Sequence, residues 1–262
     1  MKYYVVSDIH GYYSILKSEL ERKGFFSEKA GVDHKLVVCG DLFDRGKQAR
    51  ELQDFILDLM SRDEVILIRG NHEDLMLSLL DDELMWFGQN MFYSHHQSNG
   101  TVGTVLQLTK SSVSKVVFQP DLVRNAMGST PFIRKIIPAM VDFFETTHYI
   151  FVHGWIPCHC IRINQYAEKF EFNPNWRKSS VDDWNFARWT NGMNAAKDGV
   201  IEPEKTIVCG HWHCSFGHSK LEGKGSEFGK DADFTPYFSK GIIAIDACTA
   251  ESHSINCLVL ED

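Results

Sequence analysis

Short apolar runs alternate with helix-like segments over the first eighty residues, and this alternation limits the possible folds more than any other feature of the chain. The runs at residues 3–6, 36–39 and 65–68 are rich in β-branched and other apolar side chains, as buried strands are. Between them, apolar residues recur every three or four positions, which is the period of a helix with one buried face. Strands and helices in this order predict an α/β fold with right-handed crossovers between parallel strands.

Residues 84–145 differ in character, because polar segments interrupt the apolar pattern and no strand-like alternation persists. We expect a mostly helical insertion or cap there. Further strand-like runs are found at residues 149–152, 206–209, 242–245 and 255–260. Residues 155–204 are expected to be irregular. The sequence contains no repeat, low-complexity tract or domain linker, so we expect a single domain over residues 1–262.

The composition is that of a soluble globular protein, with 44% hydrophobic residues, but the chain is acidic, with a formal net charge of −8. An acidic chain is a poor partner for nucleic acid or for an anionic membrane surface, and we expect neither as a partner. Such a chain also lacks long-range attraction for an anionic substrate. A phosphate site in it would therefore need local positive charge, which metal ions can supply.

The cysteines and the N-terminal residues bear on location. Seven cysteines, an odd number at irregular spacing, predict free thiols and a reducing compartment. The N-terminal residues reach a carboxylate at Asp8 too soon for a signal peptide, and no apolar run is long enough to cross a bilayer. We therefore expect a cytoplasmic protein.

Five of the expected strands end in a short segment that carries Asp, Asn or His beside glycine. Since sites in open α/β sheets form beyond the carboxyl ends of the strands, we expect these side chains to gather at one edge. Buried together, carboxylates and imidazoles destabilise a fold unless they bind a cation, so the pattern predicts a metal site. The segments are Ser7-Asp8-Ile9-His10-Gly11, Gly40-Asp41-Leu42-Phe43-Asp44-Arg45-Gly46, Arg69-Gly70-Asn71-His72-Glu73, His153-Gly154 and Gly210-His211-Trp212-His213.

The order and content of these segments resemble the calcineurin-like metallophosphoesterase superfamily. Its pattern is Asp-x-His, Gly-Asp-x-x-Asp, Gly-Asn-His-Glu or -Asp, His, and Gly-His-x-His. The forms here look like the serine/threonine phosphoprotein phosphatase branch, especially its bacterial and phage lambda members. The resemblance covers the motifs from Asp8 to His213. It implies a four-layer α/β/β/α sandwich with the metals at one edge and a mostly helical insertion at residues 84–145.

The resemblance also implies two metal ions and their ligands. A mixed oxygen and nitrogen donor set suits Mn, Fe, Zn or Ni better than Mg or Ca. Two such ions, about 3.5–4 Å apart, would clamp the phosphate and hold a bridging hydroxide that attacks phosphorus in line. The implied ligands are Asp8 and His10 for the first ion, Asp41 as the bridge, and Asn71, His153 and His211 for the second ion.

Four further side chains have implied roles in catalysis. His72 would not be a ligand but would protonate the leaving alcohol oxygen as the general acid, and Asp44 would orient it by a hydrogen bond. Arg45 would hold phosphate oxygens with its planar guanidinium group. Arg188 is the candidate for a second phosphate-binding arginine. The alternative is that Arg188 packs its stem between two tryptophans as an ordinary surface residue.

His213 departs from the pattern of the phosphatase branch, which usually has only the first histidine of the last motif. In the phosphodiesterases of the superfamily, a second histidine at this place binds the first metal. His213 is therefore an expected extra ligand, and its presence bears on the substrate.

The resemblance implies hydrolysis of phosphomonoesters, with phosphoserine or phosphothreonine in proteins as the first choice and small phosphoesters as further substrates. A symmetrical dinucleoside tetraphosphate hydrolase and a phosphodiesterase are the enzymatic alternatives. Glu73 and Asp44 favour the phosphatase, because the tetraphosphatase more often has Asp in place of the first and often lacks the second. A non-catalytic binding protein on the same fold is a remote alternative, since such proteins usually lose a ligand or the acid, and none is missing here.

Overall fold

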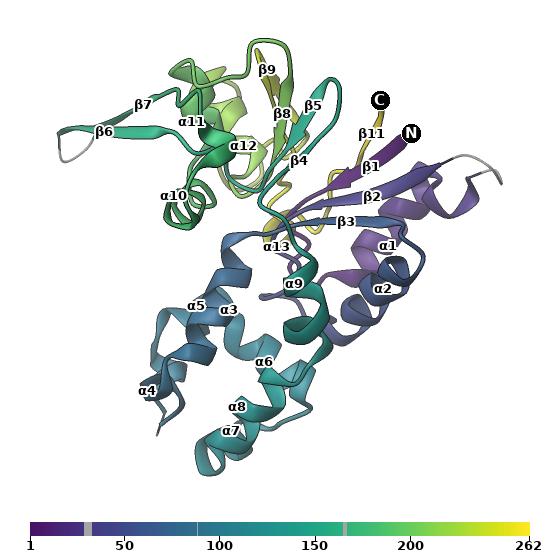
Figure 1. The fold of residues 1–262 in the computed structure, drawn as a ribbon, viewed down its shortest axis with the longest axis vertical. Helices are drawn as coiled ribbons and strands as arrows, with labels where there is room; N and C mark the ends of the chain where they lie inside the picture. The colour runs from purple at the N-terminus through teal and green to yellow at the C-terminus, as the bar shows by residue number, and fades with distance from the viewer. Residues whose placement is uncertain (29–32, 88, 165–166) are drawn as a thin grey trace.

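The first of two stacked sheets is built from the N-terminal half of the chain and its C-terminal strand (Figure 1). The computed structural model describes residues 1–28, 33–87, 89–164 and 167–262. In this sheet three parallel strands lie in chain order, and the C-terminal strand pairs antiparallel with the first. Their bounds, in the spatial order of the sheet, are β11 (Leu258–Glu261), β1 (Lys2–Val6), β2 (His34–Cys39) and β3 (Val65–Ile68).

Two amphipathic helices, α1 (Tyr13–Lys23) and α2 (Ala49–Ser61), cover the outer face of this sheet. Leu16, Leu20 and Leu52 are fully buried against it, which confirms the helical stripes expected from the sequence. A short 3-10 turn, η1 (Phe25–Ser27), follows α1.

The second sheet lies against the inner face of the first. Side chains that alternate along the central strands of both sheets form a shared apolar core, which places the two sheets between layers of helices. The core includes Tyr3, Val5, Val37, Cys39, Phe151, Val208 and Ile243. The strands of the second sheet, in spatial order, are β4 (Phe144–Glu145), β5 (Tyr149–Phe151), β8 (Thr206–Cys209), β10 (Ile242–Ala244) and β9 (Tyr237–Ser239). The expected α/β/β/α sandwich is confirmed.

The prediction that residues 155–204 are irregular was wrong. They form a hairpin, a 3-10 turn and two helices. The two helices cover the outer face of the second sheet together with three buried tryptophans. The hairpin projects from the body of the molecule in Figure 1, and its strands are polar, so the sequence lacks the apolar alternation that signals a half-buried strand. The elements are β6 (His159–Asn164), β7 (Ala167–Glu171), η4 (Trp176–Lys178), α10 (Val181–Ala187) and α11 (Gly192–Lys197).

The expected insertion is mostly helical and forms a lobe beside the sheets (Figure 1). It is entered through α3 (Asn71–Asp81) and ends before β4. Residue 88, within the expected insertion, and residues 165–166 lie outside the described residues. The elements of the lobe are α4 (Glu83–Trp86), η2 (Asn90–Tyr93), α5 (His95–Asn99), α6 (Thr101–Thr109), α7 (Val113–Phe118), α8 (Pro120–Gly128), η3 (Phe132–Ile136) and α9 (Ile137–Ala139).

Three short elements complete the C-terminal part of the chain: α12 (Cys214–Phe216), η5 (Gly217–Leu221) and α13 (Thr249–Ser252). None of the seven cysteines is in a disulfide bond, as expected from the sequence. Among the helices that the structure describes, none is both long enough and apolar enough to pass through a lipid bilayer.

Candidate metal centre

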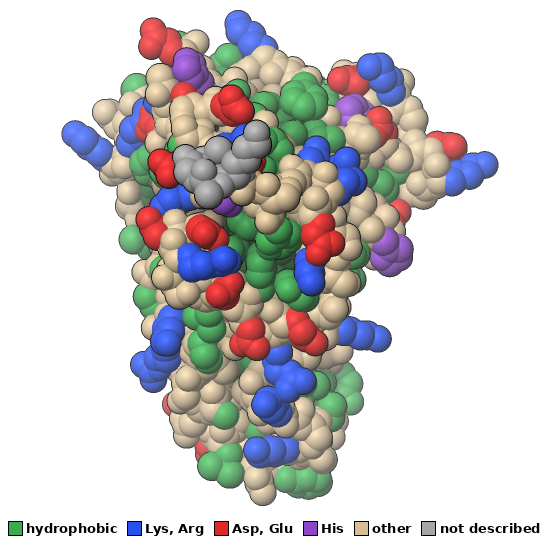
Figure 2. Space-filling view, turned by 90° about the vertical axis from the view of Figure 1, so that its right-hand side faces the viewer, with side chains coloured by type: hydrophobic (Ala, Val, Ile, Leu, Met, Phe, Trp, Pro, Cys, Tyr) green, Lys and Arg blue, Asp and Glu red, His purple; other side chains and the backbone are tan. Residues whose placement is uncertain are grey.

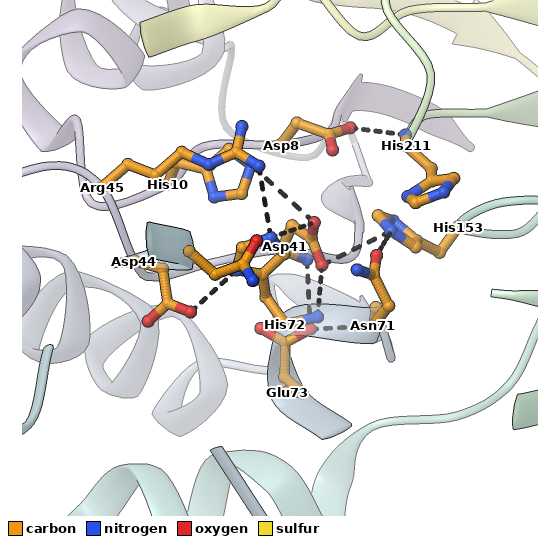
Figure 3. A network of polar contacts seen from close by, with 12 residues as sticks. Asp8, His10, Asp41, Asp44, Arg45, Asn71, His72, Glu73, His153 and His211 are labelled. Carbon is orange, nitrogen blue, oxygen red and sulfur yellow. Dashed lines mark hydrogen bonds and ion pairs between the residues drawn. The ribbon is translucent and has the colours of Figure 1, made fainter. Parts of the chain in front are cut away.

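The carboxyl ends of β1, β2, β3, β5 and β8 converge on one site at the edge of the two sheets (Figure 3). In the close-up, Asp41 lies at the centre, with the side chains from the other strand ends around it. Because parallel strands deliver their following loops to the same edge, segments more than a hundred residues apart in the sequence meet here. The residues brought together are Asp8, His10, Asp41, Asp44, Arg45, Asn71, His72, Glu73, His153 and His211.

Asp41 is the common member of two groups that could hold metal ions. His10 and His72 each direct Nε2 at its Oδ2 atom, at 3.8 Å in both cases. His153 directs Nε2 at its other oxygen, Oδ1, at 3.4 Å. The ligand atoms of His10, Asp41 and His72 lie within 4.8 Å of one another, as do those of Asp41, His153 and His211. A carboxylate with one oxygen in each group has the geometry of a bridge between two ions.

Backbone carbonyls fix the tautomers of two of these histidines. His10 Nδ1 donates to the Phe43 carbonyl at 2.9 Å, and His153 Nδ1 donates to the Cys39 carbonyl at 2.8 Å. In each neutral ring Nε2 then carries a lone pair directed into the site. The His153 Nε2 atom lies 2.7 Å from the Asn71 Oδ1 atom, which is also an acceptor. An imidazole lone pair and an amide oxygen at this distance could both bind one metal ion, so this pair of donors fits a metal site.

Burial favours the neutral form of two of the expected ligand imidazoles. It lowers the pKa of His10 to about 3 and the pKa of His211 to about 3. For Asp41, burial acts in the opposite direction, but the neighbouring histidines outweigh it and lower the pKa of its carboxyl group. The site therefore brings imidazole nitrogens and a carboxylate oxygen together, which is the mixed donor set that Mn, Fe and Zn bind.

Two more buried carboxylates beside Asp41 call for positive charge. Burial, Asp246 and Asp41 together raise the pKa of Asp8 well above its usual value, and burial raises the pKa of Asp246. Asp8 is partly compensated, because its Oδ2 atom accepts the backbone N–H of His211 at 2.9 Å. The described residues place no lysine or arginine in an ion pair with Asp8 or Asp246. A bound cation would relieve this repulsion.

The backbone is strained where these side chains are presented. Left-handed φ angles cost non-glycine residues about 1–3 kcal/mol each and concentrate at functional sites. Six candidate site residues have them: Asp8, His10, Asp41, Asp44, Arg45 and His211. Gly40 allows the close packing beside them, because a Cβ atom there would lie 2.5 Å from His153 Nδ1, and its own φ is +82°.

Glu73 ties the loops after β2 and β3 to the start of α3. Its Oε2 atom accepts the backbone N–H groups of Gly70 at 2.8 Å and Asp41 at 3.1 Å. Its Oε1 atom accepts the N–H of Leu42 at 3.0 Å. Burial and the charge of Asp41 raise the pKa of Glu73 to about 7 against the effect of these three donors. Glu73 thus fixes the backbone that carries Asp41 without contacting the centre of the site itself.

His72 and Asp44 form a buried hydrogen-bonded pair, and His72 is also a member of the first of the two groups. His72 Nδ1 donates to Asp44 Oδ2 at 2.7 Å, so Nε2 faces the site. Burial alone would lower the pKa of His72, but Asp41 and the hydrogen bond to Asp44 outweigh it and raise the pKa. Arg45 is exposed, and its Nη2 atom lies 3.4 Å from His72 Nε2. The guanidinium group thus lies on the exposed side of the site, next to His72.

Two of the expected site residues have other partners. Arg188 is only 4% exposed, and it donates to Asp74 at 2.9 Å and to Asp142 at 2.5 Å. It is therefore not the ordinary surface residue of the alternative reading, and its contact with phosphate stays a prediction. His213 pairs with Glu227, Nε2 to Oε1 at 3.1 Å, and is in neither of the two metal groups. Its role as an extra ligand also stays a prediction.

A family model described as calcineurin-like phosphoesterase matches residues 1–215, which is most of the chain. The chain belongs to the calcineurin-like phosphoesterases. The family expected from the five motifs is confirmed, and the calcineurin-like match extends from β1 past the last motif.

Curated relatives of this calcineurin-like phosphoesterase carry two kinds of name. The serine/threonine-protein phosphatase 2 of Escherichia coli (strain K12) is 32% identical over 99 residues, covering 36% of this chain and 42% of that protein. The symmetrical bis(5'-nucleosyl)-tetraphosphatase of Buchnera aphidicola subsp. Acyrthosiphon pisum is 36% identical over 131 residues, covering 50% of this chain and 46% of that protein. The matched parts thus span less than half the length of these two relatives.

Solved structures support the fold. A cold-active protein tyrosine phosphatase superposes with a TM-score of 0.54 at 19% identity, covering 99% of this chain and 73% of that chain. The cold-active protein-tyrosine phosphatase of a psychrophilic Shewanella species gives a TM-score of 0.51 at 19% identity, covering 100% of this chain and 75% of that chain. At this identity the likeness shows a shared architecture alone.

The sequence analysis did not identify three residues that the structure brings to the site of this calcineurin-like phosphoesterase. Asp246 lies two residues after the end of β10, so the same strand-end pattern could have revealed it. Thr101 and Thr104 lie in α6 and contact Asp44. No sequence pattern marks them, because threonine is common in helices and the local sequence does not predict how the insertion packs.

Proposed function

We propose that this protein is a dinuclear metal-dependent hydrolase of phosphate monoesters, with phosphoserine and phosphothreonine in proteins as its first substrates. The observation that carries this proposal is the position of Asp41, whose two carboxylate oxygens face His10 and His153 from the two sheets, beside the hydrogen bond from His72 to Asp44. Neutral imidazoles and buried carboxylates supply the donors that Mn, Fe or Zn bind. The free thiols favour a reducing compartment, and we propose the cytoplasm.

The proposed division of labour assigns the ligands to two ions. When bound, a pair of metal ions supplies positive charge for the phosphate oxygens and makes a bound water acidic enough to serve as the nucleophile. The protein holds the donors in place through Glu73 and through the carbonyl acceptors that fix the imidazole tautomers. The ligands are Asp8, His10, Asp41, Asn71, His153 and His211, with His213 as an extra candidate.

The leaving group is served by a different set of side chains. His72 Nε2, which faces the site, would give its proton to the alcohol oxygen as the bond from that oxygen to phosphorus breaks. Asp44 holds the other ring nitrogen, so the imidazole keeps its orientation. Arg45, exposed beside His72, would hold the phosphate, and Arg188 is proposed as a second phosphate contact.

Symmetrical dinucleoside tetraphosphates are the second candidate substrate, and the likeness to the Buchnera enzyme favours them. Such a substrate carries a long polyanionic chain, which calls for grouped positive charge. Figure 2 shows the side of the molecule at the amino-terminal ends of the first sheet, away from the site, where lysine and arginine side chains lie among aspartate and glutamate side chains. Among the site residues labelled in Figure 3, Arg45 alone carries a guanidinium or ammonium group. Arg45 serves one phosphate group, and a single phosphate is what a monoester presents. We therefore rank phosphomonoesters first.

A side-by-side assay with Mn tests the proposal. The panel contains phosphoserine and phosphothreonine peptides, p-nitrophenyl phosphate, a symmetrical dinucleoside tetraphosphate and an aryl phosphodiester. We expect kcat/KM for the monoesters to exceed that for the tetraphosphate and the diester by at least about tenfold. Preference for the tetraphosphate or the diester would replace the proposed substrate class. Turnover of no member of the panel would favour a binding protein on this fold.

A further inference from the structure

One helix of the insertion reaches the proposed acid. Thr101 and Thr104 lie one turn apart on α6, are fully buried, and point at the carboxylate of Asp44. Thr101 Oγ1 donates to Asp44 Oδ2 at 2.9 Å, and Thr104 Oγ1 donates to Asp44 Oδ1 at 2.6 Å. The two threonines are 57 and 60 residues from Asp44 in the sequence, so only the folding of the lobe brings them there.

These contacts hold the carboxylate from three sides. Oδ2 accepts from both His72 and Thr101, and Oδ1 accepts from Thr104. Thr104 Oγ1 also accepts the backbone N–H of Asp44 at 3.0 Å, so one hydroxyl binds both the main chain and the side chain of the same residue. Asp44 has a left-handed backbone, with φ of 75°, and such a conformation persists only where neighbours fix it.

The start of α6 also supports the backbone beside Asp44. Gly100 precedes the helix with φ of +92°, and a Cβ atom at this position would lie 2.2 Å from the backbone nitrogen of Arg45. The helix thus abuts the loop that carries Asp44 and Arg45. The hydrogen bonds and the close packing of α6 therefore both fix the loop that carries Asp44 and Arg45.

We propose that Thr101 and Thr104 are positioning residues for the general acid, and that the helical insertion takes part in leaving-group protonation through them. The proposal rests on the proposed role of His72. A carboxylate beside a cation site is drawn toward the cations, and one that turned away from His72 would no longer hold the imidazole. Two hydroxyl donors keep the Asp44 carboxylate on His72. The insertion therefore helps to position the general acid, in addition to covering the core.

The test compares two substrates in each variant. A phosphoserine peptide needs a proton on its leaving oxygen, whereas the nitrophenolate of p-nitrophenyl phosphate leaves with little help. The ratio of the two rates is the readout, because loss of folded protein or of metal lowers both rates alike. We expect Thr101→Val and Thr104→Val each to lower the peptide rate by about tenfold, the effect of one hydrogen bond to a charged group, and the aryl phosphate rate much less.

Conservative and matched variants complete the set. Thr101→Ser and Thr104→Ser keep the hydroxyl donors and should keep the wild-type ratio. Thr109→Val removes a hydroxyl from the same helix that donates only to the Val105 carbonyl, at 2.7 Å, and it should also keep the ratio. Unchanged ratios in both valine variants at Thr101 and Thr104 would overturn the proposal, as would an equal change in the Thr109 variant.

A spectroscopic readout is independent of turnover. In metal-free protein labelled with ¹⁵N-histidine, the Nδ1–H proton of His72 should resonate far downfield, because it is hydrogen-bonded to Asp44. It should move upfield or exchange faster in the two valine variants, and an unmoved signal would contradict the proposal. His72→Asn separates the two levels of inference. If His72→Asn leaves the ratio of the two rates unchanged, His72 is not the general acid. If the ratio changes in His72→Asn but not in the two valine variants, His72 remains the acid and only the role of the threonines is refuted.

Discussion

The pKa values of three imidazoles of the site shift in different directions because their surroundings differ. Burial lowers the pKa of His10 and of His211 to about 3, which leaves their nitrogens free to bind a metal. For His72, burial acts in the same direction, but Asp41 and the hydrogen bond to Asp44 outweigh it and raise the pKa. His72 is therefore the member of this set suited to keep a proton near neutral pH, as a general acid must.

His72→Asn should separate acid catalysis from metal binding. If His72 is the acid and not a ligand, the variant should keep its metal and lose about 10²–10⁴ in rate on phosphopeptides. The loss should be smaller on activated aryl phosphates. Asp44→Asn should show the same pattern more weakly, because it orients the acid. Asp41→Asn is the contrast, since loss of the bridge should remove metal and affect both substrates alike.

Elemental analysis decides the outcome for His72. The side chain lies in one of the two groups with ligand geometry, so a metal lost in His72→Asn would make it a ligand. The general acid would then have to be another residue.

Arg188 should respond in two ways, since it is held by Asp74 and Asp142. Arg188→Ala should lower the free energy of unfolding by about 1–3 kcal/mol, because two partly buried carboxylates lose a donor. If Arg188 also binds phosphate, competitive inhibition by free phosphate should weaken while the metal content stays intact. Arg188→Lys keeps the positive charge but not the planar guanidinium group, so its stability and its inhibition by phosphate should lie between those of the wild type and Arg188→Ala. Unchanged phosphate inhibition in both variants would leave Arg188 with a structural role only.

Most of the site residues that the sequence predicts lie in the segments that follow strands, although Asp246, which lies in such a segment, was missed. Asp41 and His153 were recognised because each stands at the end of an apolar run, and parallel strands then bring them together. Thr101 and Thr104 were not, because their position depends on how the lobe packs against the loop of Asp44. Local periodicity carries no information about such long-range packing.

At the scale of elements, α3 connects the sheet to the site. The helix begins at Asn71, and Glu73 in its first turn accepts backbone N–H groups from the ends of β2 and β3. The strand ends and the helix start are thereby fixed as one unit. The strands of the first sheet were expected from their apolar runs, whereas the hairpin of β6 and β7 was missed because its strands are polar and project from the sheets.

Glu73→Gln tests this connection. An amide has one oxygen, and its nitrogen has no lone pair to accept an N–H, so at least one of the three backbone donors loses its partner. We expect a loss of about 1–3 kcal/mol in the free energy of unfolding and weaker metal binding, measured by chemical denaturation and metal titration. Asp81→Asn, at the exposed far end of α3, is the matched control and should change neither quantity. A fully stable Glu73→Gln variant would show that the helix start is held by other contacts.

At the scale of the whole molecule, the proposed ligands come from both sheets. Asp8, His10 and Asp41 follow strands of the first sheet, whereas His153 and His211 follow strands of the second. The apolar core between the sheets sets their distance, and buried carboxylates at the edge face imidazoles from the opposite sheet. The resemblance to the family supplied the two-sheet arrangement, because periodicity alone predicts only an α/β fold. The site therefore depends on how the two halves of the molecule are packed.

The central claim is that phosphate ester hydrolysis by this protein depends on metal ions held around Asp41. The most direct measurement removes metal with a chelator, verifies the removal by elemental analysis, and follows p-nitrophenyl phosphate hydrolysis as Mn is added back. The account predicts no activity in the metal-free protein, with recovery that levels off at about two equivalents of Mn per chain. Full activity in protein shown to contain no metal would contradict it.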